Sequence, residues 1–462
     1  MSGQAKVIGT GPIGWLAYIG STLAGMPAGY AAAFRARKGR TIGLTILVIA
    51  VLIYPVVNHV WLAPFSRNQF PLPIPDDTNA TFMAIFAIMA IGLNIVAGFA
   101  GLLDLGYVAF YAIGAYVAAF LASPFWAGLG LNFVFLGNVS GTSPGIHLPF
   151  WLLVPIAILV VATFGALLGA PTLRLRGDYL AIVTLGFGEI VPLVFKNLSA
   201  VTFSLNLGPL NINMHNVNLT GGVQGINPID PPFLPFFNIK FDSQAGFMPV
   251  YLGIFLLLVA TLVARNLEHS RIGRAWMAIR EDETAAEMMG VNTVRTKLLA
   301  FALGASFAGI AGALQASYLG ATTSDFFNFS ISILVLIMII LGGIGNIWGV
   351  IVGAITLVYV NYTLLPYIGQ RIQDNAPWLP NPAQYNFLIL GVILLLMMRF
   401  RPQGFLPNHQ REAELTLAGL ADADLSMGVQ PELDNVSLAP PGQSEMGPDA
   451  RSAETPGEAH DL

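Results

Sequence analysis

Long apolar runs constrain this chain more than any other feature of its sequence. An α-helix needs about 20 predominantly apolar residues to cross the hydrocarbon of a bilayer. The run 330–365 is too long for one span and is interrupted by Gly342-Gly343-Ile344-Gly345-Asn346, so we expect two helices and a turn there. With that division the sequence predicts an all-α polytopic membrane protein of about 10 transmembrane helices. The other clear runs are 42–63, 80–97, 104–122, 151–171, 179–196, 247–264, 298–318 and 384–399.

Composition excludes several classes of protein. Only 10% of the residues are charged, whereas a soluble domain carries about 25%. The chain has no cysteine, which excludes disulfides, thiolate metal sites and cysteine nucleophiles. None of its lysines follows a glycine, so the glycine-rich phosphate-binding loop that ends in Gly-Lys is absent. We therefore expect no cofactor and no metal site, and if the chain is driven by ATP, another subunit supplies the nucleotide site. An enzyme would need a cluster of ionisable or metal-ligating residues at one depth, and since none appears, we expect no enzymatic activity.

Charge and composition divide the chain into three parts. Residues 409–462 hold eleven acidic and two Arg residues, whereas residues 1–408 hold fourteen acidic and nineteen basic residues. We interpret 408–462 as a disordered acidic C-terminal tail, because a segment rich in Pro, Gly, Ser, Asp and Glu cannot build a core. Residues 1–40 are interpreted as a cytosolic or interfacial N-terminal extension. The transmembrane domain is then 41–407.

Lysine and arginine favour cytoplasmic loops, and their distribution predicts the orientation of this chain. Basic residues precede the first span and follow the fourth, the sixth and the last. With about 10 helices all of these positions fall on one side of the membrane, so both termini are expected in the cytoplasm. The predicted cytoplasmic residues are Arg35, Arg37, Lys38, Arg40, Arg174, Arg176, Arg265, Arg271, Arg274, Arg280, Arg295, Lys297, Arg399 and Arg401.

The predicted outer segment 197–246 is too polar to be embedded in lipid. It is also too long for a simple connector. Its many Asn, Pro and Gly residues lead us to expect an external cap with little regular structure. A variable loop without function is the alternative.

Acidic residues within or beside the apolar runs are candidate pathway positions, because a carboxylate at such depth is costly. Asp104 and Asp178 lie at predicted cytoplasmic helix ends, where capping of a helix N-terminus is the favoured alternative. Glu189 lies in mid-helix before Pro192, which kinks or breaks a helix. For Glu189 a role in the pathway and a role in helix packing both stay open. Asp325 lies near an outer helix end.

The segment 265–297 is the longest predicted inside loop and the most charged part of the membrane domain. Within it, the stretch from Arg280 to Gly290 predicts a short helix. Asp282 is a natural N-cap, Glu283 suits the positive N-terminal end, and Gly290 is a natural stop. An apolar surface on this helix could dock into a groove on another protein, and a solvated surface helix is the alternative. That surface consists of Ala285, Ala286, Met288 and Met289.

The same stretch resembles the cytoplasmic EAA loop of ABC-importer permeases through Glu283-Thr284-Ala285-Ala286 followed by Gly290. The glutamate is displaced by one position from the family pattern. In that family the loop forms the coupling helix, which fits into a cleft of the ATPase subunit. The resemblance implies that coupling to an ATPase falls on Arg280, Glu281, Asp282, Glu283, Ala285, Ala286 and Gly290.

Further stretches between residues 80 and 407 are similar to LivM-type branched-chain amino-acid permeases. One of them, from Arg176 to Glu189, contains Asp178 and Thr184. We take Thr184, together with Glu189, Asp104 and Asp178, as candidate pathway or packing residues. The outer loop contributes Leu219-Thr220-Gly221-Gly222, followed by Gly225-Ile226. The remaining similar stretches are Gly101 to Tyr107, Arg271 to Ala275, Ile279 to Glu283, Leu341 to Asn346 and Arg401 to Phe405.

This resemblance implies the permease subunit of an ATP-binding-cassette importer that carries branched-chain or related amino acids across the bacterial inner membrane. Its implied partners are cytosolic ATPase subunits, a second, LivH-type permease, a periplasmic solute-binding protein, membrane lipid and a small-molecule substrate, with no nucleic acid. A urea or short-chain amide permease is the alternative, because the family includes both. A stand-alone ion-coupled carrier is less favoured, since it needs coupling-ion ligands near the midplane and usually shows internal repeats. Only Glu189 is a strong candidate for such a ligand.

Overall fold

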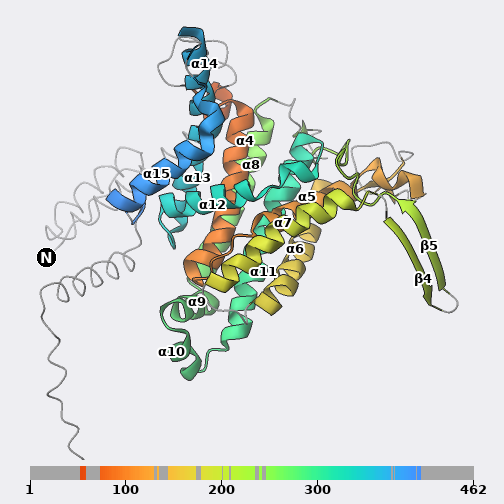
Figure 1. The fold of residues 1–462 in the computed structure, drawn as a ribbon, viewed down its shortest axis with the longest axis horizontal. Helices are drawn as coiled ribbons and strands as arrows, with labels where there is room; N and C mark the ends of the chain where they lie inside the picture. Colours follow the sequence, from red (N-terminus) through yellow and green to blue (C-terminus); the bar gives the residue numbers. More distant parts are fainter. Residues whose placement is uncertain are drawn as a thin grey trace, which may run out of the picture. The chain divides into compact units, whose positions relative to one another are not determined.

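In the computed structural model the chain folds into packed α-helices with a few short strands between them (Figure 1). None of the residues in the predicted N-terminal extension or the acidic tail belongs to the described part, so those two predictions stay untested. The structure describes residues 53–58, 73–129, 133–134, 144–172, 178–199, 201–207, 210–234, 239–241, 246–375, 378, 380–401 and 403–406.

Two of the helices continue into π-helical segments, and the longest connections, between α5 and α6 and between α7 and α8, contain the strands. The helices are α4 (Asp77–Leu93), η2 (Asn94–Phe99), α5 (Val108–Leu121), α6 (Phe150–Thr172), α7 (Asp178–Asn197), α8 (Met248–Glu268), α9 (Arg271–Glu281), α10 (Glu283–Met288), α11 (Thr293–Leu319), α12 (Phe329–Gly342), α13 (Ile347–Tyr359), η5 (Val360–Leu364), α14 (Leu365–Asn375) and α15 (Asn386–Phe400). Short 3₁₀ turns complete them: η3 (Pro124–Leu129), η4 (Ser324–Phe326) and η6 (Pro382–Tyr385).

Eight helical segments of the described part are long and apolar enough to cross a membrane. The segment Tyr107–Leu121 is apolar but shorter. The predicted run 42–63 lies largely outside the described residues. The prediction of a polytopic helical membrane protein is therefore confirmed, with these eight segments: Asp77–Phe99, Phe150–Thr172, Tyr179–Asn197, Met248–Glu268, Thr293–Leu319, Ser324–Gly342, Ile347–Asn375 and Pro382–Phe400.

Helix α11 lies at the centre and packs against α4, α5 and α6. Small residues make these approaches close: a Cβ on Gly114 of α5 would lie 2.5 Å from the carbonyl oxygen of Gly309. Gly304 of α11 would likewise meet the carbonyl of Gly92 on α4. Small residues at helix contacts replace the hydrophobic driving force that is missing inside lipid. The core is therefore held by backbone-to-backbone packing around α11.

The run 330–365 forms two helices, as predicted. Helix α12 ends at Gly342, and the turn contains Gly343 and Gly345 at positive φ. Asn346 then caps α13, because its Oδ1 accepts hydrogen bonds from the N–H groups of Trp348 and Gly349. Past the turn, α13 packs back against α12.

The prediction for the outer segment 197–246 is wrong in part, because the segment contains regular structure. Strands β4 (Val201–Leu207) and β5 (Leu210–Val217) pair antiparallel, and β6 (Phe233–Leu234) pairs with β7 (Ile239–Lys240). Apolar and polar residues alternate along Val201-Thr-Phe-Ser-Leu-Asn-Leu207, which is the period of a strand. That local signal was masked by the Asn, Pro and Gly content. A third small sheet joins β1 (Ala122–Ser123), β2 (Phe133–Val134) and β3 (Ile146–His147).

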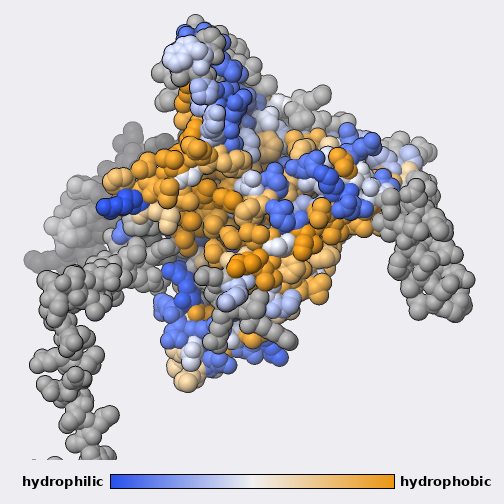
Figure 2. Space-filling view, viewed as in Figure 1, coloured by the Kyte–Doolittle hydropathy of each residue, from blue (hydrophilic) through white to orange (hydrophobic). Residues whose placement is uncertain are grey.

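The connecting segments gather at two ends of the bundle. At the α9–α10 end, Gly345 donates its N–H to Oδ1 of Asn94 at 2.9 Å, and Phe405 donates to the carbonyl of Leu341. At the α14 end, Ile226 pairs with Thr322. Figure 2 shows an apolar surface over α7, α12 and α15 between more polar surfaces at α9–α10 and at α14. This arrangement is typical of a membrane-spanning bundle.

Candidate functional site

Helix α10 begins at the cap that the sequence predicts. The carboxylate of Asp282 accepts hydrogen bonds from the backbone N–H groups of Thr284 at 2.8 Å and Ala285 at 3.0 Å. The predicted helix from Arg280 is wrong in one respect, because Arg280 and Glu281 belong to α9. Asp282 has extended backbone (φ −152°, ψ 112°) and ends α9 while it begins α10. The segment is thus a pair of short helices with a bend.

The C-terminal end of α10 is closed at Gly290, as predicted. Gly290 has φ +87°, a conformation that a glycine adopts without steric cost. Its N–H donates to the carbonyl of Glu287, and the N–H of Val291 donates to the carbonyl of Ala286. These two bonds form a Schellman motif, which satisfies the last carbonyls of a helix.

Three contacts hold α9 and α10 against the bundle. Nζ of Lys297 on α11 lies 2.6 Å from Oε1 of Glu283. The indole N–H of Trp276, which is fully buried, donates to the carbonyl of Thr296 at 2.8 Å. On the other side, Nη1 of Arg280 donates to the carbonyl of Gly98 in η2 at 2.8 Å.

The outward surface of α10 exposes two methionines beside the polar Thr284 and Glu287. Met288 is 83% exposed and Met289 is 85% exposed. Ala285 is exposed beside them, whereas Ala286 is buried against the bundle. The structure therefore separates the predicted apolar residues into an inner contact and an exposed patch. We call Ala285, Met288 and Met289 the methionine patch.

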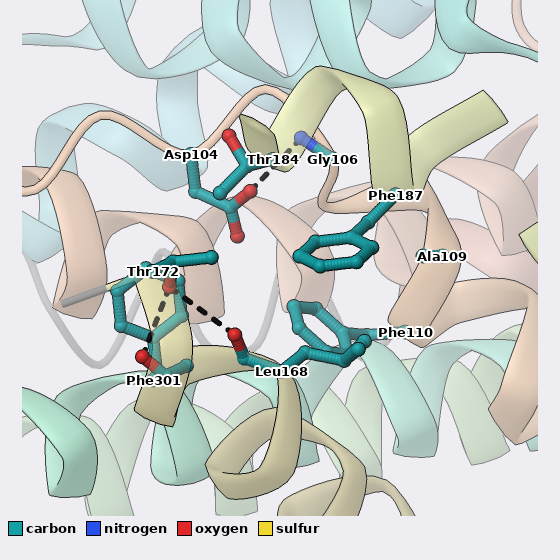
Figure 3. Close-up of a pocket in the computed structure, with 10 residues that line it drawn as sticks. Asp104, Gly106, Ala109, Phe110, Leu168, Thr172, Thr184, Phe187 and Phe301 are labelled. Atoms are coloured by element: carbon teal, nitrogen blue, oxygen red, sulfur yellow. Dashed lines mark hydrogen bonds between the residues drawn. The ribbon is translucent and has the colours of Figure 1, made fainter. Parts of the chain in front are cut away.

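Asp104 lies buried in the loop between η2 and α5, with 2% of its surface exposed (Figure 3). Its Oδ1 accepts the N–H of Gly106 at 2.9 Å. Its Oδ2 is buried and has no hydrogen-bond partner among the described residues. The capping interpretation is wrong for Asp104, because the N-cap of α5 is Tyr107 and no side chain caps it. Asp104 shapes the turn that leads into α5.

Thr184 brings α7 onto the same loop. Its Oγ1 accepts the N–H of Leu105 at 3.1 Å, and the side chain is 4% exposed. Gly188, one turn further along α7, packs so closely that its Cβ would lie 3.0 Å from Cα of Gly106. Asp104 and Thr184 both line a small cavity of ≈ 10 Å³ with Thr172 and Phe187 (Figure 3). A space of this size holds about one water molecule.

The structure bears differently on the predictions for Asp178 and Glu189, the two acidic residues of α7. Asp178 is the first residue of α7, but its side chain lies outside the described part, so its capping stays a prediction. Glu189 is exposed in mid-helix. It shares its helix with exposed apolar side chains, among them Ile182, Ile190 and Leu193. The structure therefore does not bring Glu189 together with Asp104 and Thr184.

The predicted outer-loop residues form a tight turn at the end of α7. Oγ1 of Thr220 donates to the carbonyl of Phe195 at 2.5 Å, and the side chain is buried. Gly221 and Gly222 both have positive φ. A Cβ on Gly221 would collide with the carbonyl of Gly225. These residues hold the outer loop on α7, which is a structural role.

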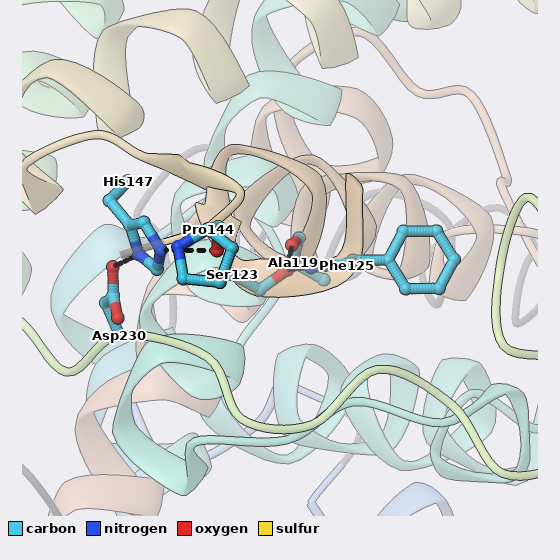
Figure 4. A network of polar contacts seen from close by, with 6 residues as sticks. All are labelled: Ala119, Ser123, Phe125, Pro144, His147 and Asp230. Atoms are coloured by element: carbon cyan, nitrogen blue, oxygen red, sulfur yellow. Dashed lines mark hydrogen bonds and ion pairs between the residues drawn. The ribbon is translucent and has the colours of Figure 1, made fainter. Parts of the chain in front are cut away.

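Sequence reasoning missed a partly buried polar pair in the outer segments, in which His147 is buried and Asp230 is half-buried (Figure 4). Nδ1 of His147 lies 2.6 Å from Oδ2 of Asp230, and Nε2 of His147 lies 3.3 Å from the carbonyl of Pro144. Burial raises the pKa of the Asp230 carboxyl, and the hydrogen bond and charge of His147 oppose that rise. The backbone N–H of Asp230 also donates to the carbonyl of Ala122. No sequence pattern predicts this pair, because His147 and Asp230 are far apart in the chain.

Within the described ranges, no group of three His, Cys, Asp or Glu residues lies close enough to hold a metal ion. What the site offers instead is a short helix, held against one end of a membrane bundle, that exposes the apolar methionine patch.

Comparison with known proteins places this sequence in a family. A family model described as the branched-chain amino acid transport system permease component matches residues 76–398. The high-affinity branched-chain amino acid transport system permease protein LivM of Salmonella typhimurium is 36% identical over 396 residues, which cover 82% of this chain and 78% of that protein. The LivM protein of Escherichia coli K12 gives the same identity and coverage. The LivH protein of Escherichia coli K12 is 23% identical over 341 residues, 72% of this chain and 95% of that protein. No solved structure matches at a significant level.

Proposed function

Because this chain belongs to the family of branched-chain amino acid transport permeases, we propose that it is the transmembrane subunit of an ATP-binding-cassette importer. Its cargo is a branched-chain amino acid, and it works in the bacterial inner membrane. Separate ATPase subunits hydrolyse the ATP, a second LivH-type permease pairs with it, and a periplasmic binding protein delivers the substrate. The relatives named LivM and LivH support this assignment.

The observation that carries the proposal is the construction of α10. A six-residue helix is far too short to be stable alone, yet both of its ends are capped and Glu283 pairs with Lys297. The methionine patch on this helix is left exposed. Methionine is flexible and polarisable, which suits a surface that fits into a partner's groove. We assign that groove to the ATPase subunit.

Two hydrogen bonds connect the end of α9, next to α10, to the membrane helices and can transmit a movement of α10. Arg280, just before the bend, binds the carbonyl of Gly98 at the end of η2. Asn94, at the start of η2, accepts the N–H of Gly345 in the α12–α13 turn. When the ATPase subunits close on ATP, we expect α9 and α10 to move as one lever and to carry η2 and this turn with them. Rigid-body movement of packed helices is a common form of such switching.

The position of Glu189 supports the proposal that a second permease packs beside α7. Ionisable residues within a membrane span almost always face a bundle interior or a water-filled cavity. The described part of this chain does not cover the face of α7 that carries Glu189, and only 22% of the apolar window of the span Tyr179–Asn197 is buried. We therefore propose that this face meets the second permease and that Glu189 lies on the translocation path between them.

Orientation follows from the charges at the α9–α10 end. Basic residues favour the cytoplasmic side, and this end holds Arg271, Arg274, Arg280, Arg295 and Lys297. The connecting segments at Gly98, at Gly345 and at Phe405 gather there as well. We propose that the α9–α10 end and both termini are cytoplasmic.

Uptake of radiolabelled leucine tests the function, with urea as the comparator. Cells that lack the gene are expected to lose leucine uptake and to keep urea uptake, and the intact gene on a plasmid restores it. Loss of urea uptake with unchanged leucine uptake would move the cargo to urea, while α10 would keep its role.

A further inference from the structure

A second cavity lies at the α14 end of the bundle, away from the methionine patch and from Asp104. Its volume is ≈ 380 Å³, within the range of about 300–1,000 Å³ that is usual for small-molecule sites. We call it the outer chamber. Residues from α4, α5, α11, α12, α15, η4 and η5 line it: Phe82, Phe86, Tyr111, Gln315, Leu319, Asp325, Phe326, Asn328, Ser330, Ile331, Leu334, Asn361, Tyr362, Asn386 and Phe387.

Two buried polar groups of the outer chamber lack protein partners. The hydroxyl of Tyr111 and Oε1 of Gln315 have no hydrogen-bond partner among the described residues, and their side chains are 0% and 8% exposed. Leaving a buried polar group unpaired costs free energy. Both side chains belong to the lining of the chamber, and each atom gains a hydrogen bond if a polar ligand in the chamber reaches it.

The walls of the outer chamber are apolar and aromatic. The rings of Phe82 and Tyr362 stack at 5.9 Å, and the ring of Phe86 lies 6.1 Å from that of Tyr362. Ile331 and Leu334 of α12 complete the lining of the wall. A branched aliphatic side chain would bury its surface here, whereas urea has no such surface to bury.

The rim of the chamber is polar and of mixed charge. Asp325 is exposed at the rim, and its Oδ1 lies 3.4 Å from Nζ of Lys196 at the end of α7. Nδ2 of Asn386 donates to Oδ1 of Asn361 at 3.2 Å. An acid, a base and two amides can bind both the ammonium and the carboxylate of a zwitterion.

The chamber also coincides with an irregular helix. Asn361 and Tyr362 both lie in the π-helical segment η5, which interrupts the chain between α13 and α14. Such π-segments occur frequently at functional sites. Both side chains belong to the lining of the chamber.

We infer that the outer chamber is the site at which this subunit receives a neutral, branched-chain amino acid from the outer side. The aromatic wall takes the side chain, and Tyr111 and Gln315 bind the α-ammonium or α-carboxylate at the buried end. This inference rests on the proposed function, and it adds the residues that recognise the cargo.

The experiment measures leucine uptake by the complete transporter in proteoliposomes, as a function of the concentration of leucine-loaded binding protein. Tyr111→Phe and Gln315→Leu are each expected to raise the half-saturating concentration roughly fivefold, the effect of one lost hydrogen bond. Tyr116→Phe is the matched control, because Tyr116 is also on α5, and its buried hydroxyl also has no partner in the described part, yet it does not line the chamber. Ser317→Ala on α11 controls for Gln315→Leu in the same way.

A second measurement separates binding from folding. A leucine analogue with a photoreactive diazirine in its side chain is expected to label peptides that contain Phe82, Phe86 or Leu334. The inference about the chamber would be wrong if the wild type took up leucine, all four variants had its half-saturating concentration, and the analogue labelled other peptides. The proposed function would then still stand. A wild-type transporter that does not take up leucine would overturn both.

Discussion

Nη1 of Arg280 donates a hydrogen bond of 2.8 Å to the carbonyl oxygen of Gly98, which joins the end of α9 to the end of η2. The close approach leaves no room for a side chain nearby: a Cβ on Gly101 would lie 2.9 Å from Cγ of Arg280. The two elements come from distant parts of the chain. In the proposed transporter they are the first link between the ATPase and the membrane helices.

Replacing Arg280 with alanine is therefore expected to uncouple the transporter. A hydrogen bond from a charged donor is worth about 1.5–3 kcal/mol, so we expect uptake per ATP hydrolysed to fall roughly tenfold or more. Arg280→Lys should restore part of it, because the cation is kept. Arg274→Ala is the control, since Arg274 is exposed on the same helix and its guanidinium donates to the nearby carbonyl of His269. Equal coupling ratios in Arg280→Ala and Arg274→Ala would contradict the role of this link.

Gly290→Val should disturb α10 through the backbone alone. Gly290 has φ +87° and open space around its Cβ position, so no collision with neighbours is involved. A β-branched residue in such a conformation costs about 1–3 kcal/mol. We expect ATP hydrolysis to continue while uptake is lost. Gly290→Asn is the control, because asparagine tolerates positive φ, and its uptake should stay near the wild-type rate. Normal uptake by Gly290→Val would count against the coupling assignment.

The ion pair between Glu283 and Lys297 is expected to hold α10 in the position in which it binds the ATPase subunits. Glu283→Lys places two cations together in place of the 2.6 Å pair with Lys297. Co-purification of the ATPase subunits should fall, and the double variant with Lys297→Glu should recover part of it. Unchanged co-purification in the single variant would show that the ion pair does not hold α10 in its docking position.

The contact between α7 and the loop before α5 predicts a pair of glycine variants with opposite effects. A Cβ on Gly106 would collide with the carbonyl of Thr184, whereas nothing lies within 4 Å of a Cβ on Gly186. Gly106→Ala is expected to lower stability by about 1–3 kcal/mol. Gly186→Ala should be neutral or stabilising, because alanine favours a helix over glycine. Thermal unfolding of the purified complex measures both, and equal midpoints would show that this approach is less tight than the structure has it.

The partly buried pair of His147 and Asp230 predicts that stability depends on pH. Burial raises the pKa of Asp230, so the folded protein binds this proton more tightly than the unfolded chain does. The contribution of Asp230 to the free energy of unfolding therefore decreases as the pH rises from the ordinary aspartate pKa of about 3.9 through the raised value. We expect the unfolding midpoint of the wild type, relative to Asp230→Asn, to fall across that window and to be flat above it. A difference that rises with pH would reverse the sign of the shift.

Local features of the sequence predicted the local features of the structure well. The cap at Asp282, the stop at Gly290 and the break at Gly343 each depend on a few neighbouring residues, so their chemistry is readable from the chain. The hairpin β4–β5 was missed, because composition was weighted above the alternation of apolar and polar residues.

The parts that could not be predicted are those assembled from distant segments. Asp104 was expected to cap a helix, but its environment is set by Thr184 on α7 and by Phe301 on α11. The outer chamber draws its lining from seven elements, and no pattern along the chain marks Tyr111 or Gln315. Both are ordinary residues of apolar helices until the fold leaves their polar atoms unpaired.

The shortness of α10 has a consequence for how the transporter is put together. Six residues hold a helix only while the cap at Asp282, the turn at Gly290 and the pair with Lys297 are all in place. An ATPase that recognises the methionine patch thereby recognises a finished membrane domain, because the patch is in register only when α9 and α11 are seated. Binding of the ATPase subunit would then select correctly folded copies of the membrane domain. Copies that are misfolded at this end would not bind the ATPase.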